Sequence, residues 1–240
     1  MCDSPDKTPI WKAIADALRI DLAEGHYSPG EKLPTESALA DRFGVNRHTV
    51  RHGLSALVSE GLVRTRRGAG AFVVSTPADY RLGHRVRFHE NLIDAGRHPE
   101  KRVLSLDTRA ATQREARALH IQVGDQVCAY HGLLLADGQP LAVVLSVFPS
   151  MRLSGIFEAL SATTSVTQAL RSVGIDDYTR ASTRLTAVRS TATQALLLQA
   201  GEGDPLLRSS SVNQCANAIP VEYGRTWFVG DRITLTLGET

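Results

Sequence analysis

Cysteine is scarce in this sequence of 240 residues: only Cys2, Cys128 and Cys215 are present, and no two of them are spaced as CxxC. This pattern argues against a disulfide framework or a zinc ribbon and favours a reducing cytoplasm. Long apolar runs are also lacking, since stretches such as 141–145 fall far short of the ~18 residues that a membrane span needs. The N-terminal MCDSPDKTP lacks the apolar core of a secretory signal. We therefore expect a cytoplasmic protein without a membrane partner.

Negative charge is nearly absent from residues 42–67, which carry six arginines against the single acid Glu60. The whole chain has a formal net charge of only +2. A local basic patch on a nearly neutral chain is typical of proteins that bind a nucleic-acid backbone, whereas a merely solvated helix face usually mixes both signs. The length and the 42% hydrophobic residues allow one large domain or two smaller ones.

Three helices are predicted in the first sixty residues. Apolar residues that recur every four positions predict a helix over 11–24. Thr35 and Asn46 are good N-caps for two further helices, which would end at Phe43 and at about Glu60. Two short helices joined by a tight turn are the arrangement of a helix-turn-helix, whose second helix enters the major groove of DNA.

The third predicted helix has one apolar and one basic face. Apolar residues recur at helical spacing from Val50 to Val58 and would face the core. The opposite face is polar and carries Arg47, His48, Arg51, His52 and Ser55. Residues 62–74 then indicate a two-stranded hairpin, or wing, with glycines at its tip. His48 and His52 have the spacing of zinc ligands but no third ligand nearby, and the GAG at 68–70 lacks the GK[ST] of a phosphate-binding loop.

The string GHYSPGEKLPTESALADRFGVNRHTVRHGLSALVSEGLVRTRRGAGAFV resembles the winged-helix domain of GntR-superfamily bacterial transcription factors. Many relatives carry an arginine directly after the Glu of the LPTE run, where this chain has Ser37; Arg42 and Arg67 are candidates to replace it. The resemblance and the polar face together imply DNA contacts from the LPTE run, the third helix and the wing. The residues in question are Thr35, Ser37, Arg47, His48, Thr49, Arg51, His52, Arg67, Gly68 and Gly70.

A short polar break at 75–79 separates two domains. We place the DNA-binding domain at residues 1–75, a linker at 76–80 and a second domain at 81–240. In the second domain, helices are predicted at 87–95, 112–120, 165–173 and 191–198, and strands at 103–108, 127–135, 141–148, 179–188, 206–213, 220–228 and 233–237. A helix, a Gly-Asp turn and a proline-containing hairpin occur twice. This repeat predicts a pseudo-symmetric, mainly antiparallel α+β sheet with a cleft between its halves.

The second domain resembles the UTRA ligand-sensing domain of the HutC subfamily, which shares its fold with chorismate lyase. The resemblance covers about residues 80–238 and rests on RFHENLIDAGRHP, ADGQP, TSVTQAL, STRLTA and PVEYGRTWFVGDRITLTL. Within the subfamily, RFHENLIDAG, VNRHTVR and STRLTAVR are most like the repressors of phosphonate-utilisation operons, the PhnF type. The implied fold class is α+β, a winged helix followed by a chorismate-lyase-like UTRA domain.

Sugar-phosphate sensors of this subfamily carry an Arg pair before the hairpin turn and a Glu after it. The matching residues here are Gly132, Leu134 and Val144, which counts against an amino-sugar phosphate. The remaining Arg, Ser and Thr donors suit a phosphonate or phosphate, which accepts several charge-assisted hydrogen bonds. Thr164 and Ser165 open a helix, whose free N–H groups favour an anion.

Further candidates lie on the predicted strands. By the two-residue period of a strand, Arg180, Ser182 and Arg184 share one face. For Arg184 and Arg225 the alternative is a surface ion pair with Glu222 or Asp231. The effector set is Arg87, His89, Thr164, Ser165, Arg180, Arg184, Glu222, Tyr223 and Arg225.

These patterns predict a homodimeric repressor that binds palindromic double-stranded operator DNA and responds to a small anionic effector. We expect no cofactor and no metal. A HutC-type regulator that senses another organic acid or a sugar phosphate is the alternative. A chorismate-lyase-like enzyme is a rival, but the sequence has no G-x-S-x-G and no clear Cys–His pairing, and an enzymatic role leaves the first domain unexplained.

Overall fold

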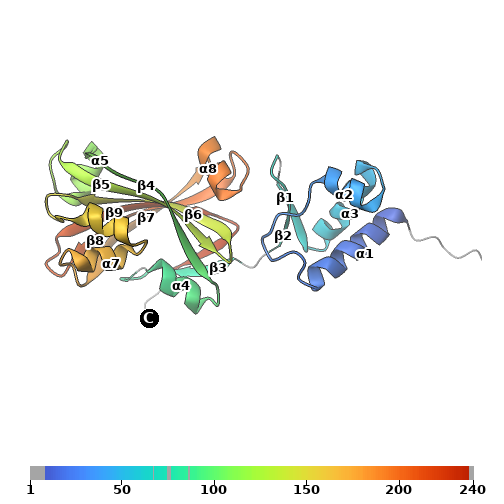
Figure 1. Cartoon of the computed structure of the whole chain (residues 1–240), viewed down its shortest axis with the longest axis horizontal. Coiled ribbons are helices and arrows are strands. Elements are labelled where there is room, and N and C mark those ends of the chain that lie inside the picture. Colours follow the sequence, from blue (N-terminus) through green and yellow to red (C-terminus); the bar gives the residue numbers. More distant parts are fainter. Residues whose placement is uncertain (1–8, 67, 75–76, 86, 238–240) are drawn as a thin grey trace, which may run out of the picture. The chain divides into compact units, whose positions relative to one another are not determined.

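The computed structural model describes residues 9–66, 68–74, 77–85 and 87–237. The chain divides into two compact units at the junction between Thr76 and Pro77. Helices and a short hairpin make up the first unit, and a large sheet flanked by helices makes up the second (Figure 1).

The first unit has the element order helix, helix, helix, strand, strand: α1 (Ile10–Ala23), α2 (Glu36–Phe43), α3 (Arg47–Ser59), β1 (Val63–Arg66) and β2 (Gly70–Val73). The side chains of Thr35 and Asn46 cap α2 and α3 by accepting hydrogen bonds from the backbone N–H groups of Ala38 and Thr49. Gly44 ends α2 with a φ of 64°, in the left-handed region that glycine adopts most easily. The winged helix-turn-helix fold predicted from the sequence is confirmed.

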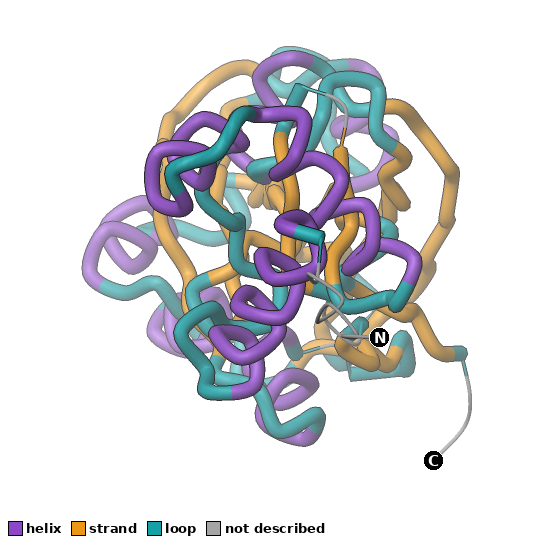
Figure 2. The backbone as a smooth tube through the Cα atoms, turned by 90° about the vertical axis from the view of Figure 1, so that its right-hand side faces the viewer, coloured by secondary structure: helices purple, strands orange, loops and turns teal. Residues whose placement is uncertain are grey.

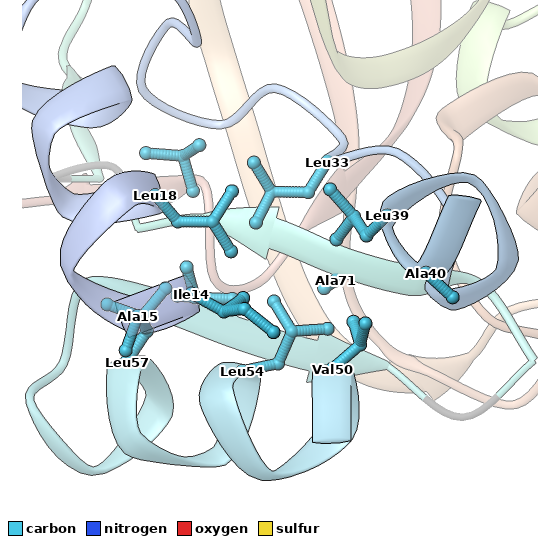
Figure 3. Close-up of a cluster of buried hydrophobic side chains, with 12 residues drawn as sticks. Ile14, Ala15, Leu18, Leu33, Leu39, Ala40, Val50, Leu54, Leu57 and Ala71 are labelled. Carbon is cyan, nitrogen blue, oxygen red and sulfur yellow. The ribbon is translucent and has the colours of Figure 1, made fainter. Parts of the chain in front are cut away.

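One apolar core holds these helices and the hairpin together (Figure 3). Leu18 of α1 and Val50 and Leu57 of α3 are fully buried in it. Gly53 lets α1 approach α3 closely, because a Cβ at this position would lie 3.0 Å from the carbonyl oxygen of Trp11. The buried face of α3 is therefore fixed, and its opposite face is left to solvent.

Six strands of the second unit form an antiparallel sheet in the order β4-β5-β6-β9-β8-β7. They are β4 (Pro99–Ala110), β5 (Gln126–Ala136), β6 (Gln139–Pro149), β7 (Tyr178–Arg189), β8 (Pro205–Cys215) and β9 (Pro220–Val229). Each is longer than predicted. Strand β4 gains most, because its hydrogen-bonded ladder continues into polar residues such as Glu100 and Arg102, which hydrophobic periodicity does not detect. Short helices separate these strands along the chain, except within the β5–β6 and β8–β9 hairpins. Figure 2 colours the helices purple and the strands orange.

Short helices cover both faces of the sheet: α4 (Phe88–Asp94), α5 (Gln113–Leu119), α6 (Ile156–Ala162), α7 (Val166–Ser172) and α8 (Ala192–Leu198). Helices α4, α6 and α7 pack on the face that contains Tyr130 and Leu134 of β5. Helices α5 and α8 pack on the face that contains Val127 and Leu133 of the same strand. Successive strand residues point to opposite faces, so each strand contributes to both layers.

The internal repeat predicted from the sequence is present. Helix α5 with β5 and β6 corresponds to α8 with β8 and β9. Thr112 and Thr191 open the two helices with the same capping box. Strands β6 and β9 pair at the centre of the sheet, so the two copies meet there.

Helix α6 and strand β3 (Ala78–Arg81) were not predicted. Strand β3 pairs in parallel with β10 (Ile233–Thr236), and its Ala78 and Tyr80 are buried. Residues 78–80, which the sequence placed in a linker, therefore belong to a strand. The four-residue segment is too short to show a strand period.

Glu115 of α5 provides a test of stability against pH. Its carboxylate accepts hydrogen bonds from Arg109 Nη2 at 2.7 Å and from Thr112 N at 2.9 Å. Burial alone would raise the pKa of Glu115, but these partners outweigh burial and lower the pKa from 4.5 to about 2. Because the folded-state pKa lies below the unfolded value, the stabilisation is complete above about pH 4.5 and is lost as the pH falls towards 2.

We expect Glu115→Gln to lower the free energy of unfolding by about 1–3 kcal/mol at pH 7 and by much less at pH 2. Urea denaturation of the full chain at both pH values measures this difference. Glu158→Gln, at an exposed position of α6, is the matched control and should change little. An equal loss at both pH values would show that the ion pair does not stabilise the fold.

Candidate functional site

The start of α3 is an exposed basic surface. Arg47, His48 and Arg51 are exposed, whereas Val50 is fully buried. The Asn46 cap fixes the first turn, where free N–H groups and the helix dipole attract anions. Such a helix start can be placed against phosphates and base edges in the major groove.

Two arginines of α3 contact the beginning of α2. Arg47 Nη2 donates to Ser37 Oγ at 2.9 Å. Arg51 Nε and Nη2 donate to the two carboxylate oxygens of Glu36 at 3.0 and 2.6 Å, and this pairing lowers the pKa of Glu36. These contacts orient both guanidinium groups before any DNA is present.

Arg42 and Arg67 are the candidates to replace the arginine that many relatives carry at the position of Ser37. Arg42 instead pairs with Asp21, with Nη1 and Oδ2 at 2.7 Å, and its hydrogen bond lowers the pKa of Asp21. Its guanidinium also lies 4.9 Å from the centroid of the Phe43 ring. Arg42 is thus engaged within the first unit, and Arg67, the other candidate, lies outside the described residues.

His52 is turned towards α1. Its ring stacks on the ring of Trp11, with centroids 4.3 Å apart and an angle of 15° between the planes. Such a contact stabilises the packing of α1 against α3. The geometry therefore favours a packing role for His52 over the DNA contact predicted from the sequence.

Glycines shape the tip of the wing. Gly68 and Gly70 have φ values of 75° and 107°, which residues with a Cβ rarely adopt. Lys32 lies beside this tip, since a Cβ on Gly70 would be 3.0 Å from Lys32 Cε. Leu33 N donates to the carbonyl of Ala71 at 2.9 Å, so the segment before α2 extends the hairpin. Lys32 was not predicted at this site, although it is the lysine of the EKLP run.

The second unit contains a cavity of about 1080 Å³ on the sheet face that α4 and α7 cover. Six of the predicted effector residues line it: Arg87, His89, Thr164, Ser165, Arg180 and Glu222. Ser165 caps α7 by accepting a hydrogen bond from Gln168 N at 3.3 Å. The cavity thus gathers residues that lie far apart in the sequence.

Arg87 is the centre of one end of the cavity. Its Nη1 donates to Thr167 Oγ1 at 3.0 Å, and its guanidinium lies 5.1 Å from the centroid of the Tyr178 ring. Asp177 Oδ1 is 3.6 Å from Arg87 Nη2, and a hydrogen bond from Arg85 lowers the pKa of Asp177. Guanidinium and hydroxyl donors converge here as an oxyanion requires.

Arg180 begins a hydrogen-bonded chain across the cavity floor. Its Nε donates to Asn213 Oδ1 at 2.8 Å, and Asn213 Nδ2 donates to Glu222 Oε2 at 2.6 Å. Ser146 Oγ donates to the other carboxylate oxygen of Glu222 at 2.5 Å. Glu222 is buried, and these partners satisfy it.

The predicted common face of Arg180, Ser182 and Arg184 is wrong. A β-bulge lies between Arg180 and Ser182: Arg180 is opposite Asn213, whereas Ser182 is opposite Val212. The extra residue reverses the alternation, so Thr183, not Arg184, shares the cavity face with Arg180. Accordingly, Arg180 Nη1 donates to Thr183 Oγ1 at 3.4 Å.

Tyr223 and Arg225 also lie on the other face of the sheet, as Arg184 does. They alternate with Glu222 and Gly224, which line the cavity. Burial lowers the pKa of Arg225, with a further contribution from neighbouring Arg208 and Arg114. The geometry therefore removes Arg184, Tyr223 and Arg225 from the effector set.

Several residues of the cavity were not predicted from the sequence. Thr167 and Tyr178 contact each other at 2.9 Å through their hydroxyls, and burial raises the pKa of Tyr178. Lys101 and Tyr130 also line the cavity. The TSVTQAL motif was a signal for Thr167, but Lys101 and Tyr130 depend on strand register, which no motif records.

Comparison with known proteins defines the class of both units. Residues 11–73 match the family model described as bacterial regulatory proteins, gntR family, and residues 94–234 match the UTRA domain. A regulatory DNA-binding unit followed by a UTRA unit is the architecture of a transcriptional regulator.

The chain belongs to the GntR family and is a HutC-type regulator similar to PhnF. It is 35% identical to an uncharacterized HTH-type transcriptional regulator of Rhizobium meliloti, over 95% of this chain and 94% of that protein. It is 32% identical to the probable transcriptional regulator PhnF of Escherichia coli, over 95% and 94%. The crystal structure of PhnF from Mycobacterium smegmatis matches with a TM-score of 0.66 at 26% identity, over 95% of this chain and 99% of that chain. The Rhizobium meliloti and Escherichia coli relatives are named as transcriptional regulators and not as enzymes.

In the part of the chain that the structure describes, no helix has both the length and the apolarity to cross a bilayer. The same residues contain no group of three or more His, Cys, Asp or Glu side chains that could hold a metal ion. Cys128 and Cys215 are free thiols, and burial raises the pKa of Cys128 to about 11.

His52→Ala tests the packing role of this histidine. Loss of the stacked ring should lower the stability of the first unit by about 0.5–1.5 kcal/mol. Thermal unfolding followed through Trp11 fluorescence measures this in a Trp227→Phe background. Ser55→Ala, one turn further along the exposed side of α3, should cost less, and equal stability of the His52 variant and its parent would contradict the assignment.

Proposed function

We propose that this protein is a homodimeric repressor of a phosphonate-utilisation operon. It binds palindromic double-stranded operator DNA and releases it when a small anionic effector occupies the cavity of the UTRA unit. The observation that carries the proposal is this cavity, whose arginines and hydroxyls suit an oxyanion, in a chain similar to proteins named PhnF.

The start of α3 supports the DNA-binding half of the proposal. Arg47, His48, Thr49 and Arg51 would enter the major groove, and Gly68 and Gly70 would bring the wing backbone near the minor groove. Ser37 and Glu36 hold the two arginines in place. A two-fold dimer would meet half-sites about one helical turn apart.

The chemistry of the cavity supports a phosphonate or phosphate group. Arg87, Ser165 and Thr167 offer donors at one end, and Arg180 adds a second guanidinium. Leu134 and Val144 line the wall with apolar groups, so sugar hydroxyls would lack partners there. Ligand binding changes DNA affinity only if the effector binds one dimer geometry better than the other.

A HutC-type sensor of another organic acid or a sugar phosphate is the second candidate. Glu222, Asn213 and Ser146 form a polar floor that could accept and donate hydrogen bonds to ligand hydroxyls. Titration with sugar phosphates and urocanate beside phosphonates separates the two candidates.

Arg47→Ala should weaken DNA binding without unfolding the protein. We expect a loss of about tenfold or more in affinity for a duplex that the wild type selects from a random-sequence library, since one good Arg contact contributes about 1–3 kcal/mol. If Arg47 contacts a phosphate, the slope of log affinity against log salt concentration should also decrease by about one. Arg19→Ala, an exposed arginine of α1 that pairs with Glu60, is the control. Unchanged affinity of the Arg47 variant at low salt would refute the placement of α3.

Butylphosphonate should raise the melting temperature of the wild type. Binding at about 100 times Kd adds about 2.7 kcal/mol of stability, which corresponds to a shift of several degrees. Arg87→Ala should remove the shift, whereas Arg184→Ala, on the opposite face of the sheet, should retain it. Stabilisation by urocanate alone would contradict the phosphonate assignment. Release of the selected duplex by the stabilising ligand then tests repression directly.

A further inference from the structure

The internal repeat places a cation at the same position of each edge strand. Lys101 of β4 lies opposite Leu134, which lies opposite Ala142 of β6. Arg180 of β7 lies opposite Asn213, which lies opposite Glu222 of β9. Lys101 and Arg180 both line the cavity, which therefore reaches from one edge strand to the other.

The two cations differ in what surrounds them. Arg180 is held by Asn213 and Thr183. The corresponding strand neighbours of Lys101 are apolar, and within the described residues its ammonium has no hydrogen bond or ion pair. Its ring contact is with Phe88, at 5.7 Å from the centroid. A half-buried ammonium that lines a cavity without a protein acceptor is available to an acceptor on a ligand.

Tyr130 brings a second unused donor to this end of the cavity. It is 1% exposed, and its hydroxyl has no hydrogen-bond partner in the described part of the chain. The hydroxyl lies 3.0 Å from where a Cβ of Gly132 would be. Gly132 is opposite Val144, a cavity residue, so the absent side chain leaves room for the phenol on the cavity side. Any larger residue at 132 would displace this ring.

We propose that Lys101 and the Tyr130 hydroxyl form a subsite for a carboxylate, and that the effector is a two-ended molecule with a phosphonate or phosphate at the Arg87 end. This inference rests on the proposed function. One ammonium and one hydroxyl match the two oxygens of a singly charged carboxylate. The carboxylate of Glu222 interacts electrostatically with Lys101. Its negative charge disfavours a phosphonate or phosphate dianion at this subsite, in addition to the one at the Arg87 end.

The dimensions of the cavity agree with a two-ended ligand. Its volume of about 1080 Å³ is at the upper end of ligand sites, which measure about 300–1,000 Å³. A phosphate ion or a short alkylphosphonate would leave most of that space unfilled. The walls between the two ends include Phe88, Leu134 and Val144, which suit an alkyl or other apolar linker.

Isothermal titration calorimetry of the full chain with phosphonobutanoate and with butylphosphonate tests this subsite. The probes differ by one carboxylate. We expect phosphonobutanoate to bind about tenfold more tightly or better, as one charge-assisted contact pair provides. Lys101→Met should reduce this preference to about threefold or less, and Tyr130→Phe should reduce it in part. Butylphosphonate, which has no carboxylate, should lose less affinity than phosphonobutanoate in both variants.

Arg102→Met, one residue along β4 at an exposed position paired with Glu100, is the matched control and should keep the preference. Equal affinity of the wild type for the two probes would overturn the carboxylate subsite and leave the proposed function standing. A preference that survives Lys101→Met would also overturn it. If neither probe binds, the phosphonate assignment and the subsite both fail.

Discussion

Side-chain alternation in the six-stranded sheet is the constraint on which the lining of the cavity depends. Because neighbouring strand residues face opposite layers, a shift of one position exchanges a cavity residue for one beneath α5 or α8. The bulge after Arg180 makes this exchange within a single strand. It brings Thr183 to the cavity side of the sheet and leaves Arg184 on the other side. The composition of the cavity is thus set by backbone register as much as by residue type.

The DNA-binding unit depends on a different kind of contact. The position of α3 is set by its buried side, where Val50, Leu57 and the absence of a side chain at Gly53 allow α1 to pack closely. The exposed side is already organised by Ser37 and Glu36. Holding the guanidinium groups in place reduces the side-chain entropy lost on binding. A DNA phosphate that replaced Glu36 as the partner of Arg51 would have to compensate for the loss of that ion pair.

Much of this molecule could be read from its sequence. Caps at Thr35, Asn46 and Thr112 marked helix starts correctly, because capping is a local property. The helix-turn-helix, the wing and the repeated helix–hairpin unit were predicted for the same reason, because each is determined by residues that are close together in the sequence.

The features that escaped prediction are non-local. Strand β3 exists because it pairs with a segment about 150 residues away. The exclusion of Arg225 from the cavity and the inclusion of Lys101 follow from pairing across several strands. His52 had the exposure and the helix position expected of a DNA contact, but its ring stacks on the ring of Trp11, forty-one positions earlier. Such outcomes depend on which distant residues meet, and local patterns do not contain that information.

The parallel pairing of β3 with β10 has a mechanical consequence. β3 is the first element after the junction with the DNA-binding unit, and Tyr80 within it lines the cavity. β10 follows directly from β9, which supplies Glu222 to the cavity floor. Strand β10 therefore fastens the segment that follows the junction to strands that line the cavity. A displacement of Tyr80 would therefore act on a strand that starts directly after the junction and is held by hydrogen bonds to β10.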